Sequence, residues 1–334
     1  MKTALLFILM MLVLIAPHEF GHFIVAKLCD VQVNEFSIGM GPLLFKKKKG
    51  ETQYSLRLIP IGGYCAMEGE EKASENPRAY NKKNSGQRIA ILLAGVTMNV
   101  IIAMLACTIA TQISGVPTNT IDEVVKGSPA AISGLQDGDK ILKVDGKETP
   151  DWLDVTDAVS AYDGEGKLQM TIKRDGEEIN LSMVPKIDKE SQSYKVGIVS
   201  SLSRSPLQCV PYGIELTGTI TKEMFHAIGT IFDNGLHKDD VSGPVGLVKV
   251  VGEASSAGAS SYLILLALVS LNLALINLLP IPGLDGGKLL FIILKIITFG
   301  KINDEMEQKA SMIGLVLLLG LFAVVTINDV MNLF

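Results

Sequence analysis

The motif His18-Glu19-Phe20-Gly21-His22 lies inside an apolar run, and this combination constrains the chain more than any other feature. Residues 5–15, just before the motif, are all hydrophobic. On a helix, residues four apart share a face, so His18 and His22 can bind one metal ion. Glu19 lies beside them and can accept a proton from a metal-bound water. Because a charged Asp, Lys or Arg at the bilayer centre costs roughly 2.5–3.5 kcal/mol, the pattern predicts a functional site.

Four apolar segments are long enough to cross a bilayer, which takes ~20 helical residues. They are residues 3–28, 89–113, 262–297 and 312–331, the third being broken near 280–287. We therefore predict a multispanning α-helical membrane protein with four transmembrane helices, an inserted β-rich domain and a membrane-associated β-hairpin. Residues 1–116 are predicted to form an N-terminal membrane region, 117–200 a β-rich domain, 201–260 a linker, and 261–334 a C-terminal membrane region.

The first segment has an alternative interpretation as a cleaved signal peptide, because Lys2 precedes it and Ala16-Pro17 follows it. No small residues stand at alternate positions before Pro17, as a cleavage site would require. Cleavage there would also remove the apolar start of the helix that carries the histidine motif. We expect the segment to be retained.

The charges of the loops predict the orientation of the chain. Between Lys27 and Arg88 there are eleven Lys and Arg against seven Asp and Glu. Between Pro117 and Asp240 there are thirteen Lys and Arg against twenty-one Asp and Glu. The short basic loop is therefore expected in the cytoplasm and the β-rich domain outside it, which suits a bacterial plasma membrane. The formal net charge of −5 gives no electrostatic footprint for nucleic acid.

The loop 31–67 alternates in the manner of half-buried strands. Apolar residues recur at every second position in two segments. Lys46–Lys49 and Gly50 lie between these segments and predict a charged turn. The alternating residues are Phe36, Ile38 and Met40, and Tyr54, Leu56 and Leu58. The pattern alone leaves open whether this hairpin touches the membrane or lies in the cytosol.

A third metal ligand is expected, because a catalytic zinc site usually has three protein ligands and a water. Residues 277–287 interrupt an apolar helix with two prolines and three glycines. Backbone groups freed in this way must be buried in protein or face a water-filled cavity. Asp285 lies at the break and can supply an oxygen ligand. The alternative is that Asp285 merely caps the next helix.

Three amides in apolar segments need hydrogen-bond partners. Asn272 and Asn277 precede the break, and Asn99 lies four residues after Gly95 in the second apolar segment. They can either join helices or contact a substrate backbone, and Gly95 permits close helix approach. The sequence leaves both roles open.

Turn signals are dense between residues 120 and 185, where Asp145-Gly146 and Asp175-Gly176 separate short apolar strands. About 65 residues with such strands and one short helix suffice for a small domain. In the linker, residues 225–232 place apolar side chains on one helix face and are expected to lie on the outer leaflet. Cys29, Cys65, Cys107 and Cys209 have no paired spacing, so neither a disulfide framework nor a cysteine metal site is expected.

Several motifs occur in a fixed order along the chain. They are His18-Glu19-Phe20-Gly21-His22, Phe36-Ser37-Ile38-Gly39-Met40-Gly41-Pro42, Ile59-Pro60-Ile61-Gly62-Gly63-Tyr64, Gly134-Leu135-Gln136-Asp137-Gly138-Asp139, and Asn277-Leu278-Leu279-Pro280-Ile281-Pro282-Gly283-Leu284-Asp285-Gly286-Gly287. Together they resemble the site-2 protease family of intramembrane zinc metalloproteases, in its bacterial RseP-type branch. The fourth motif resembles a segment of a bacterial PDZ domain. Val96 departs from many relatives, which have proline there, and this chain has one such domain where some relatives have two.

The resemblance implies one Zn²⁺ held by His18, His22 and Asp285, with Glu19 as general base. It also implies a β-hairpin that guides an extended substrate, and Asn277 as a substrate contact. Asn272, Asn99, Tyr54, Leu56 and Leu58 are further candidates for substrate binding. The expected substrates are single-pass membrane proteins in the lipid bilayer, such as a trimmed anti-sigma factor, or remnant signal peptides. The oligomeric state is not implied, and a monomer is compatible with the sequence.

Two other classes of function compete with a protease. An inert membrane scaffold that displays the β-rich domain leaves His18, Glu19 and Asp285 without a role. An ion transporter with a broken third helix explains Asp285 and the asparagines but predicts neither retained zinc nor proteolysis. Within the protease hypothesis, the β-rich domain either excludes substrates with bulky outer parts or captures peptide carboxyl termini.

Overall fold

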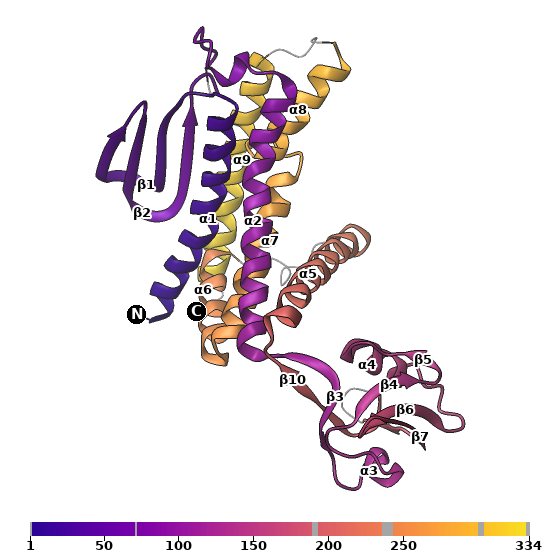
Figure 1. Cartoon of the computed structure of the whole chain (residues 1–334). Coiled ribbons are helices and arrows are strands. Elements are labelled where there is room, and N and C mark those ends of the chain that lie inside the picture. Colours follow the sequence, from indigo (N-terminus) through magenta and orange to yellow (C-terminus); the bar gives the residue numbers. More distant parts are fainter. Residues whose placement is uncertain (1, 71, 189–192, 236–242, 300–303, 332–334) are drawn as a thin grey trace. The chain divides into compact units, whose positions relative to one another are not determined.

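The computed structural model describes residues 2–70, 72–188, 193–235, 243–299 and 304–331. The chain divides into two compact units. The helical unit comprises Met1–Ala110 and Gly213–Phe334, and the β-rich unit comprises Thr111–Tyr212. Figure 1 shows both units with their helices and strands.

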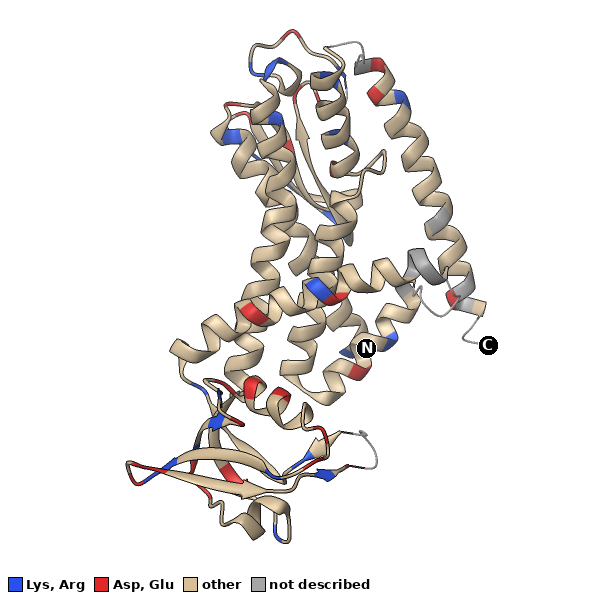
Figure 2. Ribbon diagram, turned by 90° about the vertical axis from the view of Figure 1, so that its right-hand side faces the viewer, with Lys and Arg blue, Asp and Glu red and all other residues tan. Residues whose placement is uncertain are grey.

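Within the described residues, four helices are long and apolar enough to cross a membrane. They are α1 (Lys2–Leu28), α2 (Ser85–Ser114), α7 (Ala259–Leu278) and α9 (Asp304–Met331). The helical unit also contains η1 (Tyr80–Lys82), α6 (Pro244–Ala257), α8 (Asp285–Ile297) and most of α5 (Pro206–Asn234). The core of this unit packs α1 against α2, α6 and α7, around Met10, Leu14, Ala103, Val251 and Leu271. Figure 2 shows that the long helices carry almost no charged residues along their middle parts.

The third apolar segment contains two helices. Helix α7 ends at Leu278 and α8 begins at Asp285, because Pro280 and Pro282 cannot donate the amide hydrogen bonds that would continue a helix. Gly283 takes φ +98°, a conformation that a residue with a side chain rarely adopts. Asp285 therefore lies at the first position of a new helix.

Strands β1 (Val33–Lys49) and β2 (Thr52–Met67) form an antiparallel sheet whose strands bend back on themselves. Phe36 pairs with both Tyr54 and Cys65, so residues 33–38 lie between two arms of β2. The first arm, near residues 52–58, also pairs with residues 43–49 on its other side. The second arm, residues 63–67, pairs on one side and forms an edge of the sheet.

The observed turn of this sheet differs from the prediction. Lys46 to Lys49 belong to β1 and pair with residues 52–55, and the chain reverses at Gly50 and Glu51. Lysine side chains fit an exposed strand because they need no room inside the sheet, whereas Gly50 can take the φ of +62° that the reversal requires.

Aromatic rings attach the sheet to the first helix. Phe23 on α1 lies 5.3 Å from Phe36 and 5.9 Å from Tyr54, measured between ring centroids. Ala26, Val31 and other apolar residues complete a small core at this junction. The sheet is thereby held beside the turn of α1 that follows the histidine motif.

The β-rich unit has a sheet in the order β10-β3-β4-β6-β7, with β5 paired to β4. Its elements are β3 (Val116–Val124), α3 (Pro129–Ser133), β4 (Lys140–Val144), β5 (Lys147–Glu148), α4 (Trp152–Ser160), β6 (Leu168–Arg174), β7 (Glu177–Met183), β8 (Lys186–Ile187), β9 (Tyr194–Lys195) and β10 (Ile198–Ser203). Side chains from the strands and α4 make its core, among them Ile141, Met170 and Val155. The two Asp-Gly turns occur where predicted, with positive φ at both residues of each pair.

In the linker, the amphipathic helix is longer than predicted. The apolar spacing at residues 225–232 predicts one short helix, whereas α5 extends over Pro206–Asn234. Pro211 lies in its second turn, close enough to the start that few hydrogen bonds are lost.

Candidate metal centre

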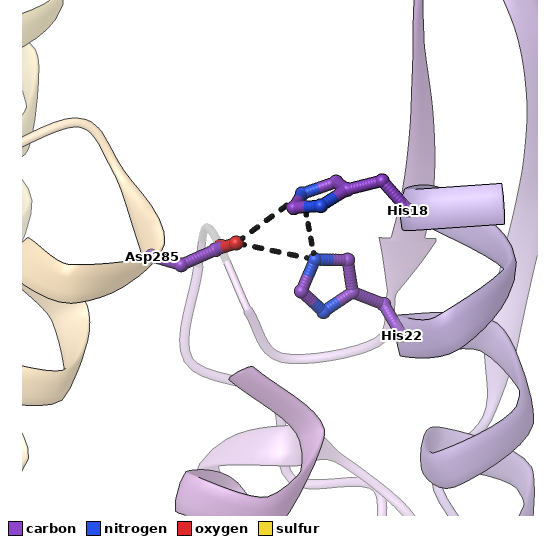
Figure 3. A group of neighbouring side chains, drawn as sticks. All are labelled: His18, His22 and Asp285. Atoms are coloured by element: carbon purple, nitrogen blue, oxygen red, sulfur yellow. Dashed lines mark hydrogen bonds and ion pairs between the residues drawn. The ribbon is translucent and has the colours of Figure 1, made fainter. Parts of the chain in front are cut away.

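Three side chains from distant regions of the sequence converge between α1 and α8. The Nε2 atoms of His18 and His22 lie 3.2 Å apart. Asp285 Oδ2 lies 3.4 Å from His18 Nε2 and 3.2 Å from His22 Nε2, as Figure 3 shows. Both imidazoles are buried, with exposed fractions of 7 % and 6 %. Among the described residues, this is the one cluster of three such groups placed to hold a metal ion.

The spacing of these three atoms fits zinc. Ligands bound at ~2.0–2.1 Å with tetrahedral angles are separated by roughly 3.3–3.4 Å. The observed separations of 3.2–3.4 Å agree with this value. Asp285 Oδ2 is moreover buried and lacks a hydrogen-bond partner among the described atoms. A buried carboxylate oxygen without a hydrogen bond is costly unless a cation binds it.

Neighbouring groups orient both imidazoles with Nε2 toward this point. His22 Nδ1 lies 2.8 Å from the carbonyl oxygen of Ile91 on α2, so Nδ1 carries the proton and donates it. His18 Nδ1 lies 3.3 Å from the side-chain amide of Asn99. Asn99 Oδ1 has no hydrogen-bond partner among the described atoms. If the amide group of Asn99 is rotated by about 180°, its oxygen faces His18 and accepts a hydrogen bond from a protonated Nδ1. Both Nε2 atoms are then free to bind a metal.

Gly95 leaves the space that the histidines occupy. A Cβ atom on Gly95 would lie 2.3 Å from His22 Nε2 and 2.7 Å from His18 Cε1. No real Cβ contact is that short, so any side chain there would displace the ligands. The sequence suggested that Gly95 permits close helix approach, and the structure adds that the approach is to the two imidazoles themselves.

Close backbone packing holds Asp285 in place. A Cβ atom on Gly286 would lie 2.3 Å from the carbonyl oxygen of Leu279, and one on Gly287 would lie 2.2 Å from that of Ile281. The two glycines thus let α8 begin directly against the chain that leaves α7. Asp285 is consequently presented to α1 from a tightly packed turn.

An ion pair joins the first turn of α8 to the loop after β2. Lys288 Nζ lies 2.6 Å from Glu70 Oε1, and both side chains are largely buried. Neither residue was predicted from the sequence. The position of Lys288 three residues after Asp285 places it near the same helix face, which is a usable signal, but nothing local marks Glu70 as its partner.

Two cavities open onto the cluster. The larger has a volume of about 710 Å³ and is lined by His18, Glu19, His22, Asp285, Lys288 and residues 64–70. The smaller has a volume of about 260 Å³, and its lining includes His18, Glu19, Gly63 and Asn277. Glu19 and the three converging side chains are therefore accessible from two sides, and the edge arm 63–67 of β2 passes beside them.

The remaining predicted residues differ in where the structure places them. Asn277 Nδ2 lies 3.4 Å from His18 Nε2, whereas Asn272 is exposed on α7 and forms no hydrogen bond to the cluster within the described residues. Tyr54 packs against Phe23, and Leu56 and Leu58 are exposed on the arm of β2 that is paired on both sides. The main chain of that arm is therefore already occupied by the sheet.

Comparison with known proteins gives consistent results along the whole chain. A model of peptidase family M50 matches residues 6–321. A protein of Clostridium acetobutylicum that is named as a zinc metalloprotease is 38 % identical over 320 residues, which cover 95 % of this chain and 94 % of that protein. The regulator of sigma-W protease RasP of Bacillus subtilis is 27 % identical over 419 aligned positions, covering 100 % of this chain and 99 % of RasP.

A solved structure is similar to one region of the chain. The crystal structure of the PDZ domain of an SdrC-like protein from Listeria monocytogenes covers 26 % of this chain and 86 % of that domain. The sequence identity is 22 % and the TM-score is 0.22.

Proposed function

This chain belongs to peptidase family M50, and from this premise we propose that it cuts membrane proteins within or next to their transmembrane segments. Membership makes it a zinc metalloprotease of the site-2 type. The observation that carries the proposal is the triangle of His18, His22 and Asp285 between helices that are otherwise apolar. A peptidase centre among such helices serves substrates that lie in a membrane.

In the proposed arrangement α1, α2, α7 with α8, and α9 cross the bilayer. Their length and composition support this. The basic loop between α1 and α2 lies in the cytoplasm of a bacterial cell, and the β-rich unit, which we interpret as a PDZ domain, lies outside the plasma membrane. The β1–β2 sheet enters the cytoplasmic leaflet beside α1.

The chemistry that zinc supplies, when bound, is a water with a pKa of about 7 and a polarised scissile carbonyl. Glu19 accepts the proton of the attacking water and passes it to the amine that leaves. Asn277 donates a hydrogen bond to the substrate backbone beside His18, and Asn99 keeps His18 in the tautomer that leaves Nε2 free. His18, His22 and Asp285 hold the ion.

The substrate must unwind before it is cut, because a helix hides its amides in internal hydrogen bonds. A strand edge can replace those bonds. The sequence favours the arm Tyr54–Leu58 for this role, but that arm is paired on both sides. We assign the role to residues 63–67, which form an edge and line the cavities with Glu19.

Proline substitution tests the edge. Tyr64→Pro and Cys65→Pro each remove one backbone N–H, and alternate N–H groups of an edge strand point outward. At least one variant should retain zinc and lose cleavage. Retained cleavage in both variants would refute the assignment.

The natural substrate is proposed to be a single-pass membrane protein whose outer part has already been removed. The name of RasP describes a regulator of sigma-W, which supports a trimmed anti-sigma factor as one class of substrate. Remnant signal peptides are a second class, because they are also short apolar helices with little outside the membrane.

A single experiment separates the protease from a scaffold and from a transporter. The purified protein and its Glu19→Gln variant are compared for bound zinc and for cleavage of a membrane-spanning reporter. Zinc in both proteins with cleavage only by the unmodified chain is the expected result. Zinc without cleavage in either protein would favour the scaffold, and absence of both zinc and cleavage would favour the transporter.

A further inference from the structure

The end of β1 carries a dense positive charge that no described acidic residue neutralises. Lys46, Lys47, Lys48 and Lys49 are consecutive and all exposed. Their partners across the sheet are the neutral residues 52–55. Within the described residues of the chain, no carboxylate forms an ion pair with any of the four. The nearest acidic residue in sequence, Glu51, is engaged by Lys27 and Arg78 instead.

Next to the lysines, the sheet is apolar on both faces. Seven large apolar side chains between residues 40 and 59 have exposed fractions between 41 % and 62 %, and they are Met40, Leu43, Leu44, Phe45, Leu56, Leu58 and Ile59. Successive strand residues point to opposite faces, so Leu43, Leu44 and Phe45 expose apolar surface on both. A water-soluble hairpin with one packed face would carry polar residues on the other. This region of the sheet therefore fits a lipid environment.

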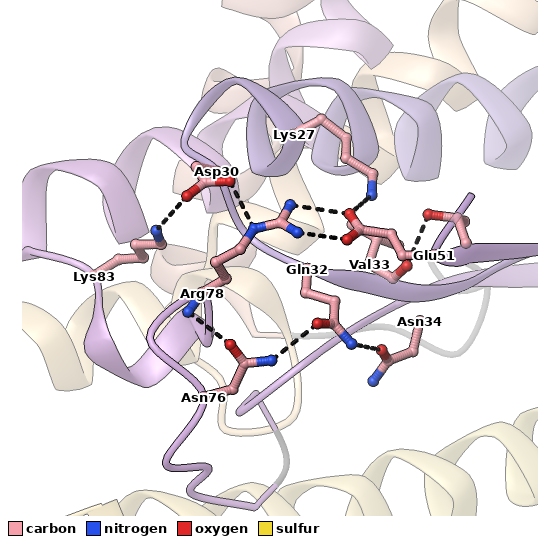
Figure 4. Close-up of polar contacts among 10 residues, drawn as sticks. Lys27, Asp30, Gln32, Val33, Asn34, Glu51, Asn76, Arg78 and Lys83 are labelled. Atoms are coloured by element: carbon pink, nitrogen blue, oxygen red, sulfur yellow. Dashed lines mark hydrogen bonds and ion pairs between the residues drawn. The ribbon is translucent and has the colours of Figure 1, made fainter. Parts of the chain in front are cut away.

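Polar contacts fix the tip of the sheet to the end of α1, as Figure 4 shows. Glu51 accepts hydrogen bonds from Lys27 and from Arg78, whose Nη1 and Nη2 lie 2.5 Å and 3.0 Å from its oxygens. The hydroxyl of Thr52 donates to the carbonyl oxygen of Val33 at 2.8 Å. The lysine run, which adjoins this tip, lies at the level where α1 ends.

Helix α1 and the β1–β2 sheet agree on how deep the apolar part of the sheet lies below the lysines. From Lys27 back to Glu19 the helix rises about 12 Å. Lys46 and Met40 lie opposite Ser55 and Ile59, which are four residues or about 13 Å apart along β2. In Figure 1 β1 and β2 lie beside α1. If α1 crosses the membrane, the apolar region of the sheet lies at the depth of the reactive groups while the lysines remain at the surface.

We propose that Lys46–Lys49 bind the headgroups of anionic phospholipids in the leaflet that the sheet enters. The occupant follows from charge and position, because four cations that pair with no described carboxylate stand where an apolar sheet meets the headgroup region. Each lysine near an anionic surface adds roughly fivefold to the affinity. The contact sets the depth of the sheet and, through it, the position of the edge 63–67 beside Glu19. The inference rests on the proposed membrane arrangement but not on the identity of any substrate.

A tryptophan reporter can test this contact in the full chain. Trp152 is the only tryptophan, so the pair Trp152→Phe and Phe45→Trp leaves one reporter next to the lysine run. The protein is reconstituted in nanodiscs that contain phosphatidylcholine and about one third phosphatidylglycerol. Bromine is placed on the acyl chains of one lipid or of the other, and the quenching of the reporter is compared at equal mole fraction of brominated lipid.

We expect brominated phosphatidylglycerol to quench several-fold more than brominated phosphatidylcholine. Changing the four lysines to glutamine should bring the quenching ratio close to one. A charge-matched control changes four exposed lysines of the β-rich unit, Lys140, Lys147, Lys167 and Lys173, to glutamine and should leave the ratio unchanged. Bound zinc is measured in every variant to verify folding.

Two results would overturn the proposal. Absence of quenching by either lipid would mean that the sheet does not touch the bilayer. An equal ratio in the parent and in the lysine variant would remove the headgroup contact. If cleavage of a reporter with an acidic cytoplasmic segment then fell only in the lysine variant, the run would bind substrate protein and not lipid.

Discussion

Replacing Gly95 with alanine tests the geometry of the metal centre most directly. The new Cβ atom would lie 2.3 Å from His22 Nε2. An ordinary contact between these atoms needs about 3.4 Å, so the ring or the α2 backbone must move by about 1 Å. A working metal site keeps its ligand distances within about 0.2 Å. The substitution therefore has to displace a ligand.

The expected loss of zinc affinity is at least 10–100-fold, the range seen when groups that only orient a ligand are removed. That range corresponds to about 1.4–2.7 kcal/mol. Alanine is also the better helix former, by roughly 0.8–1.0 kcal/mol. The clash with the imidazoles remains in the metal-free protein and costs about 1–3 kcal/mol as overpacking, which the gain in helix propensity offsets only in part. A loss of zinc affinity beyond this modest loss of folding stability separates a displaced ligand from general damage.

Zinc retention is measured against a chelator series, and thermal unfolding is followed with and without the chelator. Gly320→Ala on α9 is the matched control, because nothing lies within 4 Å of a Cβ atom there. It should bind zinc as the unmodified chain does. Unaltered zinc retention in Gly95→Ala would refute the geometry of the site.

Three further predictions concern other regions of the structure. Glu70→Lys and Lys288→Glu should each reduce cleavage and zinc retention, because breaking a buried ion pair costs about 3–5 kcal/mol; the double variant should recover some of both, and no recovery would argue against the pair. Hydrogen bonds from Arg78 lower the pKa of Glu51 to about 2, so its contribution to stability is present above its ordinary pKa and is lost as the pH falls toward 2. Thermal unfolding should show that loss in the parent and not in Glu51→Gln, and equal pH profiles would contradict it. Deleting Thr120–Pro185 should broaden the range of substrates cut if the β-rich unit excludes bulky proteins, whereas a uniform loss of cleavage would favour capture of peptide termini.

Local features of the site were readable from the sequence. The spacing of His18 and His22 fixes them on one face of a helix wherever that helix lies. The prolines at 280 and 282 end a helix for reasons internal to the chain. Both Asp-Gly turns were placed correctly, because their positive φ angles are a property of those residues.

The sequence did not show which of several similar residues lies at the site. Asn272 and Asn277 are both amides in one apolar helix, yet residues five apart differ by about 140° around its axis. Only Asn277 can then face His18, and the structure shows which one does. Likewise the alternation of Tyr54, Leu56 and Leu58 predicts a strand but not its neighbours. Residues 63–67 show no such alternation, so the sequence did not reveal that they form a second arm of β2 and an edge of the sheet.

The sequence by itself determined the reactive groups, the apolar segments and the points where helices and turns break, since each depends on residues only a few positions apart. Tertiary structure alone decided that Asp285 lies next to His18, although most of the sequence separates them, and that Glu70 pairs with Lys288. It also decided that Gly95 must lack a side chain. These outcomes depend on the paths of separate helices, and contacts between distant segments are set by packing that no local pattern records.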